Sequence, residues 1–115
     1  MSYSKIGKIK NVYLGKGGYQ DAMLGVTFDL GGDRWGVSDF VGTWGPSISS
    51  RGAKWTEGDR DAQYAKVMRR IGELLVAAKK ERLDQLKNVP VEVTFSGNNN
   101  WGGSLESWRV LTEVI

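Results

Sequence analysis

The amino-acid sequence predicts an α+β fold, in which an antiparallel sheet of about five strands carries one long helix on one face, in the order βββαββ. Twelve of the sixteen glycines lie at or before Gly58, which indicates strands and tight turns in the first half. One long stretch with helical periodicity follows, and two strand patterns come after it. The 115 residues suit a single domain, 1–115.

The first half predicts three strands separated by glycine turns. An imperfect strand pattern over residues 6–14 leads into an expected turn at Gly15–Gly18. Over residues 22–30, one set of side chains alternates strictly with another, which is the clearest strand signal in the chain. The first set is Ala22, Leu24, Val26, Phe28 and Leu30, and the second is Met23, Gly25, Thr27 and Asp29. A hairpin turn is expected at Leu30–Asp33, since glycine supplies the positive φ that such turns need. The third strand would place Trp35, Val37, Asp39 and Val41 on one face and Gly36, Ser38 and Phe40 on the other.

The second half predicts the helix and the last two strands. Thr56 is expected to cap a helix that ends near Lys80, with Asp59 close to a capping-box arrangement. Apolar side chains recur at helical spacing and form one stripe, which comprises Tyr64, Val67, Met68, Ile71, Leu74, Leu75 and Ala78. A short second helical turn at Leu83–Leu86 precedes a strand that begins at Pro90. The final strand is expected over "LESWRVLTEVI", with Trp108, Val110, Thr112 and Val114 on one side.

The composition favours a binding protein over an enzyme. The chain has no cysteine and no histidine, so it lacks thiolate metal ligands, the commonest zinc ligand and the usual general base. We therefore expect no catalytic residue, no metal and no cofactor. The formal net charge of +3 suits a small anionic ligand, a negatively charged protein, or solubility alone. No run of apolar residues is long enough for a membrane span and no secretory signal is present, which favours a cytoplasmic location without membrane contact.

Two motifs of known chemistry are weak in this sequence. The glycine cluster "GKGGYQDAML" lacks the spacing of a phosphate-binding loop and leads into a strand pattern instead of a helix. Paired carboxylates can perform glycosidase chemistry when a cleft sets their separation, and four aspartates are near each other in pairs along the chain: Asp29, Asp33, Asp59 and Asp61. Turn positions and helix-start positions account for all four.

A mixture of aromatic and basic residues over positions 35–70 is the main candidate site. Bases stack on aromatic faces with about 1–3 kcal/mol each, and guanidinium groups engage phosphates bidentately. We expect Trp35, Phe40 and Trp44 to contact bases, and Arg51, Lys54, Arg69 and Arg70 to contact phosphates. In the alternative interpretation, Trp35 and Trp108 belong to the core and Trp55 is a hydrophobic staple before the helix. A tryptophan at the hairpin tip over residues 98–101 is a further candidate for a partner contact.

Several segments carry family resemblances. The pieces "GGYQDAMLGVTFDL", "WGVSDFVGTWG", "KWTEGDR", "VPVEVTF" and "SWRVLTEV" resemble a group of small phage and prophage proteins of unassigned function, over most of the chain. The order of "VTFDLGGDRWG", "GVSDF", a helix and a "LDQLKNVPVEV"-type junction is more loosely similar to the first family of phage Thoeris anti-defence proteins, which are sponges for cyclic signalling nucleotides. That second resemblance implies an α+β fold, a homo-oligomer, ligand pockets between protomers and no catalysis.

Three functions follow as hypotheses. The first is a phage-encoded anti-defence protein, located in the host cytoplasm, that sequesters a small anionic cyclic nucleotide without catalysis. The second is a protein-binding inhibitor of a host defence effector. The third is a single-stranded nucleic-acid-binding module, for which the aromatic and basic mixture is also apt.

Overall fold

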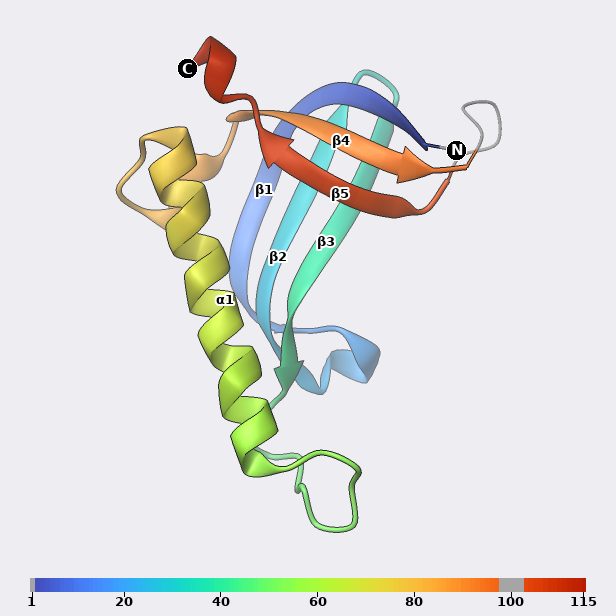
Figure 1. Cartoon of the computed structure of the whole chain (residues 1–115), viewed down its shortest axis with the longest axis vertical. Coiled ribbons are helices and arrows are strands. Elements are labelled where there is room, and N and C mark those ends of the chain that lie inside the picture. Colours follow the sequence, from blue (N-terminus) through green and yellow to red (C-terminus); the bar gives the residue numbers. More distant parts are fainter. Residues whose placement is uncertain (1, 98–102) are drawn as a thin grey trace.

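The computed structural model describes residues 2–97 and 103–115 (Figure 1). Five strands and one long helix lie in the predicted order: β1 (Ser2–Gly17), β2 (Met23–Gly32), β3 (Trp35–Trp44), α1 (Glu57–Ala78), β4 (Pro90–Ser96) and β5 (Leu105–Val110). Short 3-10 segments cover Tyr19–Asp21, Leu83–Leu86 and Thr112–Val114. The predicted α+β class is confirmed. The expected partner contact at the 98–101 tip lies outside the described residues.

The strands form one antiparallel sheet in the order β3-β2-β1-β4-β5. β1 belongs to both halves of the sheet, because its first part pairs with β4 up to Lys8 and its second part pairs with β2 from Lys8 onwards. The sheet therefore coils strongly, and β4 and β5 cross over the end of the first three strands (Figure 1). A bulge between Ile9 and Asn11 shifts the register within β1. This bulge explains the imperfect strand pattern of the sequence, since the inward-facing residues have odd numbers up to Ile9 and even numbers from Val12 onwards.

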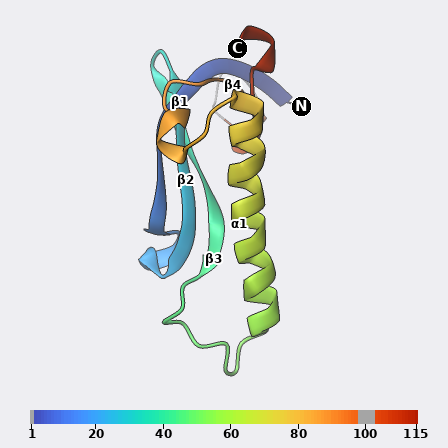
Figure 2. The same ribbon diagram turned by 90° about the vertical axis from the view of Figure 1, so that its left-hand side faces the viewer.

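The hydrophobic core lies between the inner face of the sheet and α1, which covers that face (Figure 2). Val26, Phe28 and Leu30 of β2 are essentially unexposed, as expected from their strict alternation. The predicted helical stripe is mostly confirmed, but Met68 is 65% exposed because it lies at the edge of the contact with the sheet. Each fully buried large apolar side chain stabilises the fold by roughly 1.5–3 kcal/mol.

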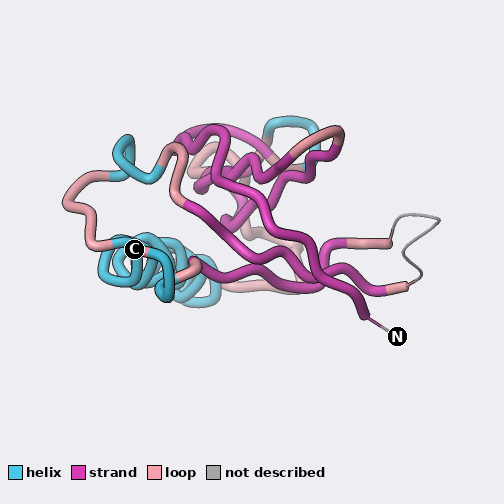
Figure 3. Tube along the Cα trace, turned by 90° about the horizontal axis from the view of Figure 1, so that it is seen from above, coloured by secondary structure: helices cyan, strands magenta, loops and turns pink. Residues whose placement is uncertain are grey.

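Side-chain contacts connect the two edge strands of the sheet, β3 and β5. Trp108 Nε1 of β5 donates a hydrogen bond to Asp39 Oδ2 of β3 at 2.7 Å. The Arg70 guanidinium of α1 lies 4.7 Å from the centre of a Trp108 ring, and Phe28 packs on that indole at 5.1 Å. Seen from above, the helix lies at one side of the curled strands (Figure 3). The sheet has β3 and β5 as its edge strands, and these two edges approach each other through the Trp108–Asp39 hydrogen bond.

The helix boundaries agree closely with the sequence. The Thr56 hydroxyl accepts a hydrogen bond from Asp59 N at 3.1 Å, and Asp59 Oδ2 accepts one from Thr56 N at 2.8 Å. These reciprocal bonds are the predicted capping box. The helix ends at Ala78, where Lys79 adopts a left-handed conformation. Among the described residues, no helix is long and apolar enough to cross a membrane.

Three predicted boundaries are wrong. The expected turn at Gly15–Gly18 begins later, because Gly15 and Gly17 continue to pair with β2. The expected turn at Leu30–Asp33 is also displaced, since Gly31 and Gly32 pair with β3 and the positive φ falls on Arg34.

The predicted final strand is too long. β5 stops at Val110 because its neighbour β4 begins at Pro90, whose carbonyl accepts the last bond from Leu111 N at 3.0 Å. The chain then turns into the Thr112–Val114 segment, so Thr112 and Val114 do not continue the face of Trp108 and Val110.

Candidate functional site

The outer face of β1, β2 and β3 is a shallow, glycine-rich surface on the side of the sheet opposite α1 (Figure 2). Two rows of cross-strand neighbours define it: Tyr13, Thr27 and Phe40 in one row, and Gly15, Gly25 and Gly42 in the next. Gly17 follows at the end of β1. We call these seven residues the outer platform.

Phe40 is the central aromatic residue of the outer platform. Its half-buried ring lies over two glycines: a Cβ at Gly42 would be 2.6 Å from Phe40 Cζ, and a Cβ at Gly17 would be 3.0 Å from Cε1. The ring therefore reaches from β3 across β2 to β1, and Gly25 between them has no side chain in the way. Glycine at these positions is what lets a large ring rest on the sheet surface.

Two exposed tyrosines extend the aromatic surface. Tyr13 occupies the same row as Phe40 and is 50% exposed. Tyr19 lies in the connection between β1 and β2 and is 66% exposed. Tyr13 and Phe40 offer flat apolar rings on the face that no helix covers, and Tyr19 is an exposed ring in the adjoining loop, which suits stacking of planar groups.

Cations border the end of the outer platform near the β2–β3 turn. The Lys10 side chain lies over Gly31, where a Cβ would be 2.7 Å from Lys10 Cε. Lys8 and Arg34 are exposed nearby, on β1 and in the turn. None of the ion pairs within the described part of the chain involves these three residues. Within β2, Asp29 is the one carboxylate on this face, and it accepts a hydrogen bond from Ser38 Oγ at 2.6 Å.

Trp35 lies on the opposite face of β3 from Phe40. Its ring meets Phe95 edge-on at 5.8 Å, packs against the core, and has Lys5 Nζ 5.7 Å from its centre. Trp35 and Phe40 therefore do not share a surface, and the alternative interpretation of Trp35 as part of the core agrees with this position. Trp108 is 7% exposed and belongs to the core as that interpretation expects.

The remaining predicted site residues fall into two further regions. Trp44 ends β3 on the Phe40 face, and Arg51 and Lys54 are exposed in the connection from β3 to α1. Arg69 is exposed on α1, whereas Arg70 lies against Trp108. The structure thus brings Phe40 and Trp44 onto one face, but it does not bring all seven predicted residues together.

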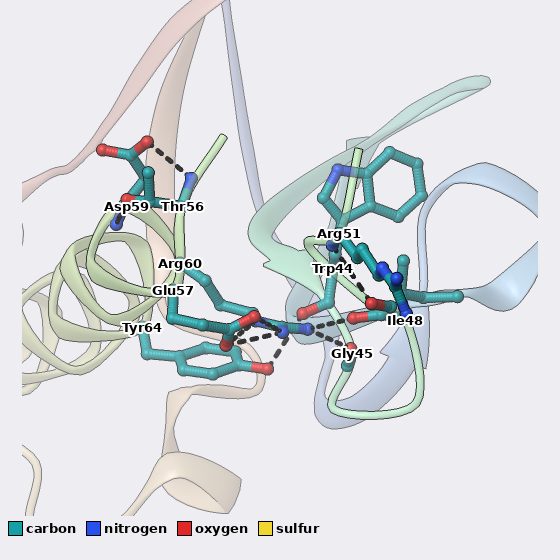
Figure 4. A network of polar contacts seen from close by, with 10 residues as sticks. Trp44, Gly45, Ile48, Arg51, Thr56, Glu57, Asp59, Arg60 and Tyr64 are labelled. Carbon is teal, nitrogen blue, oxygen red and sulfur yellow. Dashed lines mark hydrogen bonds and ion pairs between the residues drawn. The ribbon is translucent and has the colours of Figure 1, made fainter. Parts of the chain in front are cut away.

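Arg60 holds the connection between β3 and α1 in place (Figure 4). It is 6% exposed and donates to the carbonyl oxygens of Gly45 at 2.6 Å and Ile48 at 2.8 Å. It also donates to the Glu57 carboxylate at 2.6 Å, and this hydrogen bond lowers the pKa of Glu57 below its usual range. Its guanidinium lies 4.8 Å from the centre of a Trp55 ring.

Sequence reasoning did not identify Tyr13, Tyr19, Lys8, Lys10 and Arg60 as important. The alternation of side chains after the bulge places Tyr13 on the outward face of β1. The sequence does not show where the bulge lies, so the alternation alone did not predict that position. The role of Arg60 depends on carbonyl groups twelve and fifteen residues away, which no local pattern encodes.

The chemistry available on the outer platform is stacking and electrostatic attraction. The described residues contain no group of three or more Asp or Glu side chains arranged to hold a metal ion. What the surface does offer is aromatic rings, free cations and an unobstructed backbone, and these groups bind planar, anionic ligands.

Comparisons with known proteins add no assignment. No protein-family model, no curated protein and no solved structure matches the chain. The inference of function therefore depends on the geometry alone.

Proposed function

We propose that the protein binds single-stranded nucleic acid on the outer platform. The observation that carries this proposal is the half-buried Phe40 ring that rests on glycines of β1 and β3 on the helix-free face, in one cross-strand row with the exposed Tyr13. Base stacking on such rings contributes about 1–3 kcal/mol per base and tolerates any sequence, because every base has a flat face.

The shape of the surface favours an extended ligand. The outer face extends beyond the outer platform along β3, whose ten residues span about 33 Å at roughly 3.3 Å per residue. Cations lie near one end, at Lys8, Lys10 and Arg34, and again at the other, at Arg51 and Lys54. A single strand can place its bases on the rings and its phosphates near both groups of cations.

The fold is consistent with this use. Partly open five-stranded barrels such as the OB fold, which the curled five-stranded sheet resembles, bind oligonucleotides and oligosaccharides on the face of the second and third strands and through the loops after the first and fourth strands. Here Phe40 is on the third strand, and Tyr19 is in the loop after the first. Because a fold can host many functions, this analogy supports the proposal without carrying it.

Fluorescence anisotropy with labelled oligothymidine tests the proposal. We expect binding at 50 mM salt that weakens steeply at 200 mM salt, since released counterions drive phosphate contacts. Phe40→Leu keeps an apolar side chain over the glycines but removes the aromatic face, so affinity should fall by about 1–3 kcal/mol, roughly 5- to 140-fold. Unchanged affinity of Phe40→Leu, or no binding by the native protein at low salt, would refute the proposal.

A charge variant with a matched control locates the phosphate contacts. Lys10→Gln removes a cation beside the outer platform, and Lys66→Gln removes an exposed cation of α1 on the far side. The first variant should reduce the slope of log affinity against log salt by about 0.7, the expectation for one phosphate contact on a single strand. The second should leave the slope unchanged.

A cyclic nucleotide is the second candidate ligand. Tyr13 and Phe40 lie in one cross-strand row, so two rings are available within a compact area that suits a ligand with two linked bases. A phage anti-defence protein of this kind would sequester the signal in the host cytoplasm and act without catalysis. Isothermal titration against cyclic di- and trinucleotides and cyclic ADP-ribose isomers tests it, and flat traces across the panel would remove this candidate.

A further inference from the structure

A cleft with a volume of about 320 Å³ opens between the end of β3 and the start of α1. Trp44 and Trp55 both line it, and Asp59, Arg60 and Gln63 of α1 complete its wall. Its size is at the lower end of the range of about 300–1,000 Å³ for small-ligand pockets, which suits a single base or nucleoside. In the view of Figure 4 the Trp44 indole lies at the end of β3 and points away from the labelled residues of α1.

Contacts within the protein position both tryptophans that line the cleft. The Arg60 guanidinium stacks on Trp55 at 4.8 Å and is itself fixed by the carbonyl oxygens of Gly45 and Ile48. The Tyr64 hydroxyl donates to the Trp44 carbonyl oxygen at 2.9 Å. Because Arg60 fixes the Trp55 ring and Tyr64 fixes the backbone at Trp44, binding loses little side-chain freedom at Trp55.

Trp44 links the cleft to the outer platform along β3. Phe40, Gly42 and Trp44 alternate on one face of β3, so the aromatic surface reaches Trp44 at the end of the strand, where the start of α1 forms the other wall of the cleft. Arg51 and Lys54 are exposed in the same connection that carries Trp55. Gln63 adds a side-chain amide, which can both donate to and accept from a base edge.

We propose that the Trp44–Trp55 cleft is a separate base-binding subsite, which takes the terminal base of a strand that lies along the outer platform. This inference rests on the proposed function and adds to it a defined end of the binding path. Trp44 and Trp55 hold the base, and Arg51 and Lys54 meet the phosphate that precedes it. Oligonucleotides too short to span both regions bind on the outer platform alone.

A change in the ligand tests the subsite without altering the protein. Oligothymidine that spans the site is compared with two versions that carry an abasic residue at the 5′ or the 3′ end. The native protein should bind one of these about 5- to 140-fold more weakly, the effect of one lost stacked base. Trp55→Leu should bind the intact oligonucleotide with this same loss and become insensitive to the abasic end.

Control variants separate this inference from the proposed function. Trp55→Phe keeps an aromatic ring over Arg60 and should retain most of the affinity. If Trp55→Phe and Trp55→Leu are equally stable, a difference in their affinities shows that the ring contacts the ligand and does not act through stability alone. Phe40→Leu should weaken short and long oligonucleotides alike. If Phe40→Leu weakens binding but Trp55→Leu and both abasic ends do not, the subsite is refuted and the outer platform stands. If the native protein binds no oligonucleotide, both proposals fail.

Discussion

Replacing Gly42 by alanine should destabilise the protein, whereas the same change at Gly15 should not. Both residues lie in one glycine row of the outer platform. A Cβ at position 42 would lie 2.5 Å from the Leu24 carbonyl oxygen and 2.6 Å from Phe40 Cζ. Ordinary contacts need about 3.5–4.0 Å, so the overlap is about 1 Å with each atom. Ring rotation relieves only one overlap, because the other involves the backbone.

The magnitude follows from two opposing effects. Overpacking of this kind costs about 1–3 kcal/mol. Replacing glycine by alanine also restricts the unfolded chain, which stabilises by about 0.4–1 kcal/mol where the backbone is compatible. The central values leave Gly42→Ala about 1.3 kcal/mol less stable than the native protein. No atom lies within 4 Å of a Cβ at Gly15, so Gly15→Ala should gain about 0.7 kcal/mol.

Urea unfolding followed by circular dichroism measures both free energies, and the slope of the free energy against urea should stay constant. The two variants should differ by about 2 kcal/mol, with Gly42→Ala the less stable. Equal stabilities, or a less stable Gly15→Ala, would show that the Phe40 ring does not rest on the sheet as described.

Three further predictions concern the elements that position the site. Thr56→Ala removes the helix cap and should lower the free energy of unfolding by about 1 kcal/mol in urea titrations, with no loss if the cap is dispensable. Trp108→Phe removes the hydrogen bond that Asp39 accepts from the indole N–H, and it should lower the free energy of unfolding by about 1.5–3 kcal/mol in the same assay. An unchanged free energy would show that this bond does not help to join β3 and β5. Hydrogen bonds from Arg109 lower the pKa of Glu113 from its ordinary value near 4.5 to about 2. The stabilisation by the Glu113–Arg109 pair is therefore complete above about pH 4.5 and is lost as the pH falls towards 2. The difference in the free energy of unfolding between the native protein and Glu113→Gln should shrink over that pH range. A constant difference would show that the Arg109 hydrogen bonds do not lower the pKa of Glu113.

The helix was predictable because its signals are local. A cap residue, its capping-box partner three positions on, and an apolar stripe all lie within the segment itself. The exposed Met68 was not predictable in the same way, since periodicity shows which face a residue occupies but not where the partner surface ends. That edge is set by β2 and β3, which lie far away in the sequence.

The length of β1 was predicted poorly for a different reason. Glycine usually indicates a turn, but Gly15 and Gly17 remain in the strand because β2 pairs with them across its whole length. The bulge after Ile9 further disguises the pattern by shifting the inward positions by one residue. Pairing between distant segments, not local preference, decided both features.

The candidate site was predictable in its chemistry and less so in its geometry. The sequence assigned Phe40 correctly to the face opposite Trp35, because period 2 fixes sides within a strand. It could not place Tyr13 in the row of Phe40 or Lys10 over Gly31, since both positions depend on the register of β1 against β2. The expected grouping of Arg69 and Arg70 with the aromatic residues fails for a similar reason: α1 packs on the inner face.

Gly15 differs from the other glycines of the outer platform discussed above, because no packing contact within the protein requires glycine at this position. Gly17 and Gly42 have a structural reason to be glycine, because the Phe40 ring occupies the space of their side chains. Gly15 has none: its φ is not positive and nothing lies within 4 Å of a Cβ there. Glycine in a strand interior costs stability, so a bare position with no internal neighbour is best explained by an outside group that approaches the backbone. That position lies one row from Tyr13 and Phe40, where the proposed strand would rest.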